Sequence, residues 1–186
     1  MAMQLVKPAA EYLPSYVDAL QRGWSPASVR SAEIAREHRD AIADNAAAFV
    51  DSLDDPQARG KPITLPDGTQ VPRLPGFIRW MWGGEFCGSI QLRWQNGTSE
   101  LPPHVLGHIG YTVVPWKHRL GYATRALGLL LPEARAVGLD YVEITTDADN
   151  LPSQKVVTAN GGVLVERFHK LPVYGGGESL RFRIAL

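Results

Sequence analysis

The chain has 186 residues, 45% of them hydrophobic, and its 19 basic residues balance its 19 acidic residues. A chain of this length can bury a sizeable core in one compact unit. Because the net charge is zero, no general electrostatic attraction favours nucleic acid or an anionic membrane as a partner. We therefore expect neither partner, and we expect any charged ligand to be bound by a local group of residues.

The cysteine content and the first residues predict the cellular location of the protein. The single cysteine, Cys87, cannot form a disulfide within the chain. The opening residues MAMQLVKPAAEYLP contain no apolar run long enough for a signal peptide or a membrane span. We expect a soluble, cytoplasmic protein in which Cys87, inside the strand-like segment GGEFCGSIQLRW, is a small buried residue rather than a nucleophile.

The N-terminal part predicts one short strand, two helices and an irregular segment. MQLVKPA is typical of a strand, and AEYLPSYVDALQRG of an irregular helix interrupted by Pro14. Ser25 followed by Pro26 is the usual pairing at a helix N-cap and first position, so a long helix should begin there. Residues 56–76 are dense in proline and glycine and contain a PDG turn, which indicates an irregular excursion that could border a substrate site.

The remaining residues alternate strands with two helices. FIRWMW and FCGSIQLRW predict a tight hairpin, and HIGYTVV a third strand. A helix bent at Pro132 and ending at Gly138 is predicted by apolar residues at spacings of three and four. These are Ala123, Leu127, Leu130, Ala134 and Val137. YVEITTD predicts a strand, NLPSQKVVTANGG a short helix, and the C-terminal residues two strands around a glycine turn, which together give a mixed α/β sheet.

The turn before the longer of these helices, KHRLGYAT, has the form of an anion site. Free N–H groups and the helix dipole favour negative charge at a helix N-terminus, and glycine lets the backbone approach phosphate oxygens. Positive charge is supplied by Lys117, His118, Arg119 and Arg125. Neither G-x-x-x-x-G-K-[ST] nor G-x-G-x-x-G is present, so nucleoside triphosphate hydrolysis and standard dinucleotide binding are not expected. An ordinary structural cap is the alternative.

Two motifs in the second half narrow the choice. The run His118-Arg119-Leu120-Gly121-Tyr122-Ala123 is followed by Asn150-x-x-Ser153 and then by ANGGVL. This arrangement resembles the GNAT superfamily of acyl-CoA-dependent N-acetyltransferases, whose signature is Gln or Arg, two residues, Gly, one residue, and Gly or Ala. The resemblance is strongest over residues 106–166, and it points to the bacterial branch of predicted acetyltransferases, in which PDG and GHIGY segments also occur.

The resemblance implies a fold and a cofactor site. The fold would be α/β, with a mixed, mostly antiparallel central sheet, a splayed parallel strand pair and flanking helices, over one domain at 1–186. Residues 1–75 would supply the acceptor side, and residues 76–186 the core with the cofactor site. Acetyl-CoA would be the acyl donor, with its pantetheine arm paired to the backbone of Val113 and Val114. The other implied cofactor contacts are His118, Arg119, Leu120, Gly121, Tyr122, Ala123, Thr124, Asn150 and Ser153.

Two departures from the family pattern affect the chemistry. His118 stands where Gln or Arg is usual, and Val157 stands where many relatives carry a tyrosine that protonates the departing thiolate, so the leaving-group acid is unassigned. Direct attack by an amine also needs a general base, for which the candidates are His108, His104 and Glu100. Strand alternation places His108 on one face with Gly110 and Thr112, so it could point toward a substrate cleft, although a strand histidine is more often a partly buried, hydrogen-bonded group. His104 and Glu100, in a proline-flanked loop, could equally be surface residues.

The expected function is transfer of the acetyl group of acetyl-CoA to a primary amine of a small-molecule or amino-acid-like acceptor. No metal is expected, because the His and Asp residues show no ligand spacing and one cysteine cannot build a thiolate site. The alternative function is a non-catalytic acyl-CoA-binding regulatory domain, which Val157 and the lack of a clear base favour. Exposed sheet edges leave a homodimer open.

Overall fold

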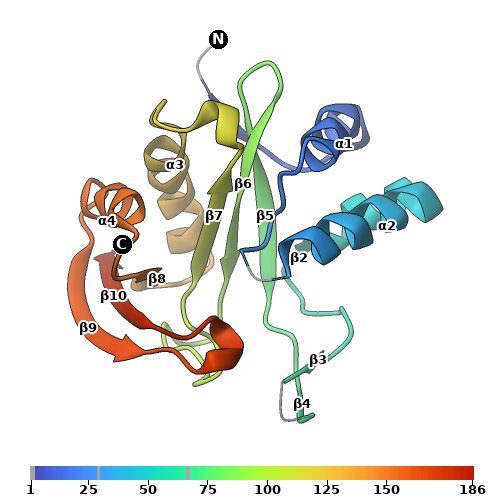
Figure 1. Ribbon diagram of the computed structural model, residues 1–186. Helices are drawn as coiled ribbons and strands as arrows, with labels where there is room; N and C mark the ends of the chain where they lie inside the picture. The colour runs from blue at the N-terminus through green and yellow to red at the C-terminus, as the bar shows by residue number, and fades with distance from the viewer. Residues whose placement is uncertain (1–2, 29, 66–67) are drawn as a thin grey trace.

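Two antiparallel sheets form the centre of the computed structural model, which describes residues 3–28, 30–65 and 68–186 (Figure 1). The first sheet has the order β1 (Gln4–Val6), β5 (Gly76–Trp82), β6 (Phe86–Arg93) and β7 (Ile109–Val113), and β2 (Asp54–Asp55) also pairs with β5. The second has the order β8 (Tyr141–Asp147), β10 (Glu178–Ala185) and β9 (Val163–His169). The predicted mixed α/β fold with antiparallel sheets and flanking helices is confirmed.

Helices cover both faces of the first sheet (Figure 1). On one face lie α1 (Leu13–Gln21) and α2 (Ser31–Ser52), and on the other lies α3 (Tyr122–Ala136), beside α4 (Leu151–Thr158). Three single-turn 3-10 helices span Ala10–Tyr12, Pro115–Lys117 and Pro172–Tyr174. Alternation along β5 serves both layers, because Phe77 and Met81 pack in the cluster with α3 while Trp80 packs with α1 and α2.

An aromatic cluster fixes α1 and α2 to the sheet. Tyr16 stacks on Trp80 with ring centroids 4.6 Å apart and meets Phe86 edge-on at 5.0 Å. Trp24, in the loop after α1, is buried in the same cluster, and its indole N–H donates to Thr112 Oγ1 (3.3 Å). These tryptophans are therefore core residues.

The sequence predicted that the long helix begins at Ser25, and this prediction is wrong. Ser25 Oγ accepts the N–H of Ala27 within a loop, and α2 starts at Ser31, after Arg30 in a left-handed conformation (φ 53°). The physical reason is a tertiary contact. Trp24 is buried against the sheet, and this holds the residues between α1 and α2 as a loop. The predicted helix also included Val29, which lies outside the described residues. Within α2, Asn45 leaves the helical conformation (φ −154°, ψ 93°), and its Oδ1 accepts the N–H of Ala48, so it caps a second helical segment.

The expected splayed parallel pair is not formed by β7 and β8, which belong to different antiparallel sheets. The two sheets join through the residues before β7, where His108 N donates to Glu143 O (2.8 Å) and Glu143 N donates to His108 Nδ1 (2.9 Å). The N–H of Glu143 is thus accepted by the His108 side chain, where a regular sheet would offer a backbone carbonyl. Among the described residues, no backbone ladder continues between β7 and β8.

Other local predictions are confirmed. The hairpin of β5 and β6 has the expected antiparallel register, and α3 ends before Gly138, which takes the left-handed conformation (φ 91°) of a helix C-terminus. α3 runs as one helix across Pro132, whereas the bend expected there stays a prediction. The proline-rich excursion carries a short hairpin of β3 (Ile63–Thr64) and β4 (Gln70–Val71), whereas Pro66 and Asp67 of the predicted PDG turn lie outside the described residues.

Candidate active site

The turn before α3 presents a run of free backbone donors. Within the described structure, no hydrogen bond is made by the N–H groups of Arg119, Leu120, Gly121, Tyr122, Ala123 and Thr124. The first intrahelical bond is that of Arg125 N to Gly121 O (3.0 Å), and no side chain caps the helix. Arg119 (φ 62°) and Gly121 (φ 76°) are left-handed, and space is open where a Cβ of Gly121 would stand. Unsatisfied N–H groups at an open helix N-terminus fit an anion.

The basic side chains of this turn are used unequally. Lys117 pairs with Glu85 (2.5 Å), and Arg125 donates to the carbonyl of Met3 (2.6 Å), so Arg125 is directed at β1 rather than at the turn. His118 Nε2 bonds Val113 O (3.0 Å), and because a carbonyl only accepts, this nitrogen carries the proton. Arg119 is exposed and has no partner among the described residues. Arg119 is thus the free cation of the turn.

The backbone of β7 is open on the edge away from β6. At the two ends of the β6–β7 ladder, Arg93 N donates to His108 O (2.9 Å) and Val114 N donates to Cys87 O (3.0 Å). In an antiparallel ladder alternate residues bond to the partner, so Tyr111 and Val113 direct their N–H and C=O groups to the other edge. Val114 O accepts Lys117 N (2.9 Å), so both polar groups of the Val114 backbone are engaged inside the protein. The backbone groups left free at this end of the edge are therefore the N–H and C=O of Tyr111 and the N–H of Val113, whose carbonyl is bonded by His118, and not those of Val114.

The start of α4 faces this edge. Asn150 Oδ1 accepts the N–H of Ser153 (3.2 Å), so the asparagine caps its own helix. The hydroxyl of Tyr111 lies 2.8 Å from Ser153 Oγ and 3.3 Å from Ser153 O, which links β7 to α4. Burial raises the pKa of Tyr111, and the hydrogen bond with Ser153 opposes that rise. Val157 is fully buried in the core.

His108 is placed as a structural group, contrary to the expectation that it points to a cleft. It is fully buried, and its Nδ1 accepts the N–H of Glu143 (2.9 Å). Nε2 then carries the proton and is directed at the backbone of Ser99 without reaching hydrogen-bond geometry. Burial is the main cause that lowers the pKa of His108 to about 4. Neither nitrogen has a lone pair free to accept a proton from a substrate.

The other two base candidates lie in different places. His104 is partly buried and lines a cavity of about 1010 Å³ between the end of α2, the excursion and the first sheet. Glu100 accepts the hydroxyl of Tyr141 (3.5 Å) beside a separate, small pocket. Of the three candidates, only His104 reaches the larger cavity.

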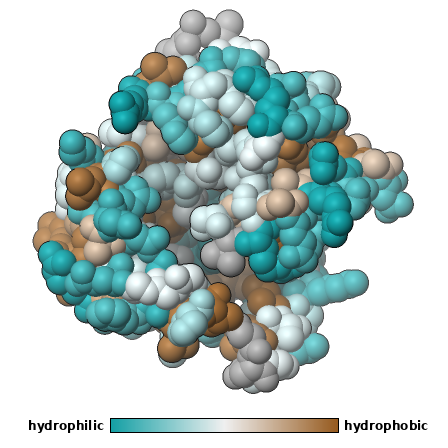
Figure 2. All heavy atoms as spheres, viewed as in Figure 1, coloured by the Kyte–Doolittle hydropathy of each residue, from teal (hydrophilic) through white to brown (hydrophobic). Residues whose placement is uncertain are grey.

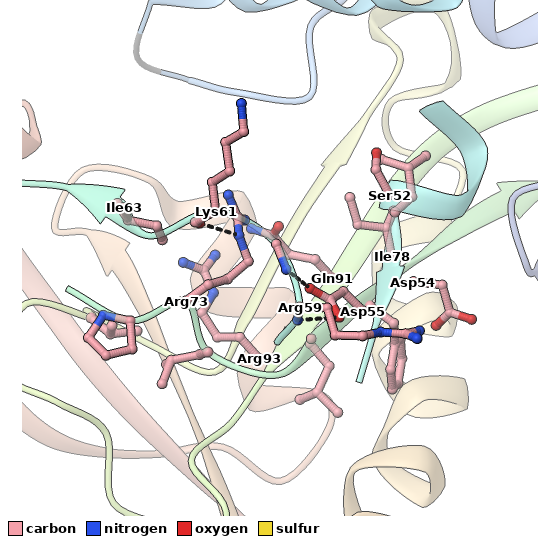
Figure 3. Close-up of a pocket in the computed structure, with 18 of the residues that line it drawn as sticks. Ser52, Asp54, Asp55, Arg59, Lys61, Ile63, Arg73, Ile78, Gln91 and Arg93 are labelled. Atoms are coloured by element: carbon pink, nitrogen blue, oxygen red, sulfur yellow. Dashed lines mark hydrogen bonds between the residues drawn. The ribbon is translucent and has the colours of Figure 1, made fainter. Parts of the chain in front are cut away.

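Sequence analysis missed three residues that line this cavity. His38, on α2, bonds Tyr16 Oη through Nδ1 (2.7 Å), and burial lowers its pKa. Gln91 and Arg93 extend into the cavity from β6 (Figure 3). A signal for the last two was present, because the alternation in SIQLRW places Ser89, Gln91 and Arg93 on the face opposite the apolar residues.

Comparison with known proteins identifies the family. Residues 30–163 match the model of the acetyltransferase (GNAT) domain. The chain belongs to the GNAT acetyltransferase family. Members are acetyl-CoA-dependent acetyltransferases, so the enzyme class and the acyl donor predicted from the resemblance are confirmed. No curated protein matches the sequence.

Solved structures of bacterial acetyltransferases share the fold. The microcin C7 self-immunity acetyltransferase MccE, in complex with acetyl-CoA and AMP, is 14% identical with a TM-score of 0.61, over 99% of this chain and 92% of that one. RimL, a ribosomal L7/L12 α-N-protein acetyltransferase in complex with coenzyme A, is 12% identical with a TM-score of 0.64, over 100% and 95%. A GNAT-family acetyltransferase from Bacillus anthracis is 16% identical with a TM-score of 0.60, over 100% and 95%.

The described residues show neither a metal-binding cluster nor a membrane-spanning helix. No group of three or more His, Cys, Asp or Glu side chains in residues 3–28, 30–65 and 68–186 could hold a metal ion. In the same residues, no helix combines the length and the apolar character needed to cross a membrane.

Proposed function

We propose that this GNAT protein transfers the acetyl group of acetyl-CoA to a primary amine of a small-molecule or amino-acid-like acceptor. The observation that carries the proposal is the run of free N–H groups from Arg119 to Thr124 at the uncapped start of α3. In this assignment the chain acts as one domain, in which residues 1–75 form the acceptor side and residues 76–186 hold the donor. The cavity supports this division, since the end of α2 and the excursion form much of its wall.

The donor site combines the turn with the open edge of β7. When bound, acetyl-CoA supplies the acetyl group as an activated thioester. The N–H groups of the turn hold its pyrophosphate, and exposed Arg119 adds a charge-assisted contact. The open backbone groups, namely the N–H and C=O of Tyr111 and the N–H of Val113, pair with the pantetheine amides as an added strand would. His118 positions this edge through its bond to Val113 O, and Asn150 acts by holding the start of α4.

Two side chains are assigned to proton transfer. His104 takes the proton of the attacking amine, because it is the base candidate that lines the cavity. Tyr111 returns a proton to the thiolate, a role that its position on the open edge and its contact with Ser153 support. A raised pKa keeps the Tyr111 hydroxyl protonated at neutral pH, as a proton donor requires. It would replace the tyrosine that many relatives carry where this chain has the buried Val157.

The alternative proposal, a non-catalytic acyl-CoA-binding domain, is favoured by the absence of that family tyrosine. The deciding experiment is calorimetric titration with acetyl-CoA, CoA and ATP, followed by a thiol-release assay with a panel of primary amines. Binding of both CoA species without ATP binding, together with amine-dependent thiol release, is expected. CoA binding with no release for any amine would instead support the regulatory domain.

The cellular location and the oligomeric state are also part of the proposal. The lone cysteine, Cys87, is buried, in keeping with a cytoplasmic protein that needs no disulfide. The edge strand β9 exposes apolar side chains at Val163, Leu164 and Val165, and Figure 2 shows apolar residues at this side of the molecule. This surface is the place at which we would look for a homodimer contact.

A further inference from the structure

The charge of the acceptor can be inferred from the cavity on the α2 side of the sheet. Its floor is the face of β5 and β6 that carries Ile78, Gln91 and Arg93, and its walls include the end of α2 and residues 59–65 (Figure 3). Its volume of about 1010 Å³ lies at the upper end of the range found for small-molecule sites. No residue of the turn at 117–124 lines it, so it is a separate compartment from the donor site.

Arg93 is an unpaired cation in this cavity. It lies on β6, between β5 and β7, opposite Gly76 on one side, and its guanidinium makes no ion pair or hydrogen bond with any described residue. Burial is the cause that lowers its pKa. A guanidinium does not lose its proton in a protein, so the cost of removing it from water is not relieved by neutralisation. A charge of this kind is usually matched by an anion.

The rest of the lining supplies no carboxylate partner for Arg93, because the charge of Asp55 acts on Arg59 and Arg73, and its backbone hydrogen bonds together with these two cations lower the pKa of Asp55. Four cationic side chains line the cavity, namely Arg59, Lys61, Arg73 and Arg93, and none forms an ion pair in the described structure. Three carboxylates line the cavity, and two of them already have hydrogen-bond or ion-pair partners. Asp54 pairs with Lys7 and Arg79 from outside the lining, and Asp55 accepts the backbone N–H groups of Arg59 (2.9 Å) and Gly60 (2.8 Å). Asp51 is exposed on α2.

The cavity extends toward β7, because Gln91 is among the residues that line it. Gln91, two residues before Arg93 on the same face, pairs with Gly110 across the β6–β7 ladder. A Cβ on Gly110 would stand 3.0 Å from Gln91 Nε2, so the Gln91 side chain lies directly against Gly110. At about 3.4 Å per residue, Arg93 lies about 7 Å along β6 from Gln91. One acceptor of modest length can thus place its amine near Gly110 and another group at Arg93.

We propose that the acceptor carries an anionic oxygen group, a carboxylate or a phosphate, which binds Arg93 in this cavity while its amine lies at the Gly110 end. This inference rests on the proposed acetyl transfer and narrows its substrate class. The planar guanidinium suits either oxyanion, because both accept two parallel hydrogen bonds.

The test compares acceptors that differ only in the distal group. Thiol release is measured with 6-aminohexanoate, its neutral amide, 1,6-diaminohexane and a matched aminoalkyl phosphate. We expect kcat/KM for one of the two anionic amines to exceed that for the neutral amide by at least tenfold, with the diamine lowest. The two anions distinguish a carboxylate site from a phosphate site. Equal rates for anionic and neutral amines would overturn the inference and leave the proposed transferase function intact.

Variants assign the preference to Arg93. Arg93→Met should abolish it, Arg93→Lys should keep a reduced preference, and the matched control Lys61→Met should keep most of it. Arg93→Met should also raise the thermal midpoint, because it removes an unpaired, partly buried charge, and a folded variant excludes misfolding as the cause. Full anion preference in Arg93→Met would overturn the assignment.

A binding measurement covers the case in which no amine is acetylated. Titration of 6-aminohexanoate and of the aminoalkyl phosphate into the protein saturated with CoA reports acceptor binding without turnover. Binding of either anion that weakens at least tenfold in Arg93→Met supports the inference even if the transferase proposal fails. The absence of binding in both wild type and variant overturns the inference.

Discussion

Replacing Gly121 by Asp places a carboxylate among the free N–H groups of the α3 turn. Space around the missing side chain is open, so the fold bears only the cost of a left-handed residue, about 1 kcal/mol, which Asn would share. Two unit charges about 6 Å apart repel by about 0.7 kcal/mol in water and about 2.8 kcal/mol at the effective dielectric constant near a protein surface. Binding of CoA should therefore weaken by about threefold to a hundredfold relative to Gly121→Asn.

The assay is calorimetric titration of CoA into wild type, Gly121→Asp and Gly121→Asn. Thermal unfolding without ligand should show that both variants fold equally well. Because exposed charges are screened by salt, the difference between the two variants should shrink at high ionic strength. Equal affinity in all three proteins would refute the placement of the pyrophosphate on this turn, and equal loss in both variants would refute the electrostatic argument.

Three further predictions concern the histidines and Tyr111. Tyr111→Phe should lower kcat by about a hundredfold and the free energy of unfolding by about 1 kcal/mol. The affinity for CoA, measured by titration, should change little. A wild-type kcat in this variant would contradict the role of Tyr111 as proton donor. His104→Asn should lower kcat/KM at neutral pH by about a hundredfold in the thiol-release assay, with recovery at high pH as the amine loses its proton unaided; an unchanged profile would remove His104 as the base. Since burial lowers the pKa of His108 from 6.5 to about 4, the unfolded chain binds more protons between these values, and stability should fall as the pH drops through that window. Urea unfolding should show a shallower fall for His108→Gln, and identical pH dependence in both proteins would contradict the buried neutral imidazole.

Local chemistry allowed the elements around the proposed donor site to be predicted from sequence. The glycine before α3, the spacing of the apolar residues on that helix and the Asn-x-x-Ser start of α4 all act within a few residues of the chain. The sequence therefore predicted the turn and both helices without knowledge of distant contacts, whereas Asn150, expected as a cofactor contact, also caps α4. Gly138 is a similar case, since a helix end requires the left-handed conformation wherever the helix lies.

The errors arose where distant contacts decide the structure. Ser25 and Pro26 have the residue types of a helix start, but burial of Trp24 overrides that preference. Strand alternation left open whether His108 points toward a cleft or is a buried, hydrogen-bonded group, and the contact that decides this is with Glu143, far away in sequence. The role of Arg93 depends equally on which charges surround it, which requires the folded cavity.

The interruption at Asn45 divides α2 into parts of different mechanical stability. Phe49 anchors the part after the break, whereas the longer part before it is held mainly by buried Ala35 and by the bond of His38 to Tyr16. An isolated helix of that length is marginal in water, and the break stops its opening from spreading into the anchored part. Its amides should exchange with solvent sooner than those of β5 and β6. Because His38 lies in the cavity wall, opening of this part of α2 would change the shape of the space that an acceptor enters.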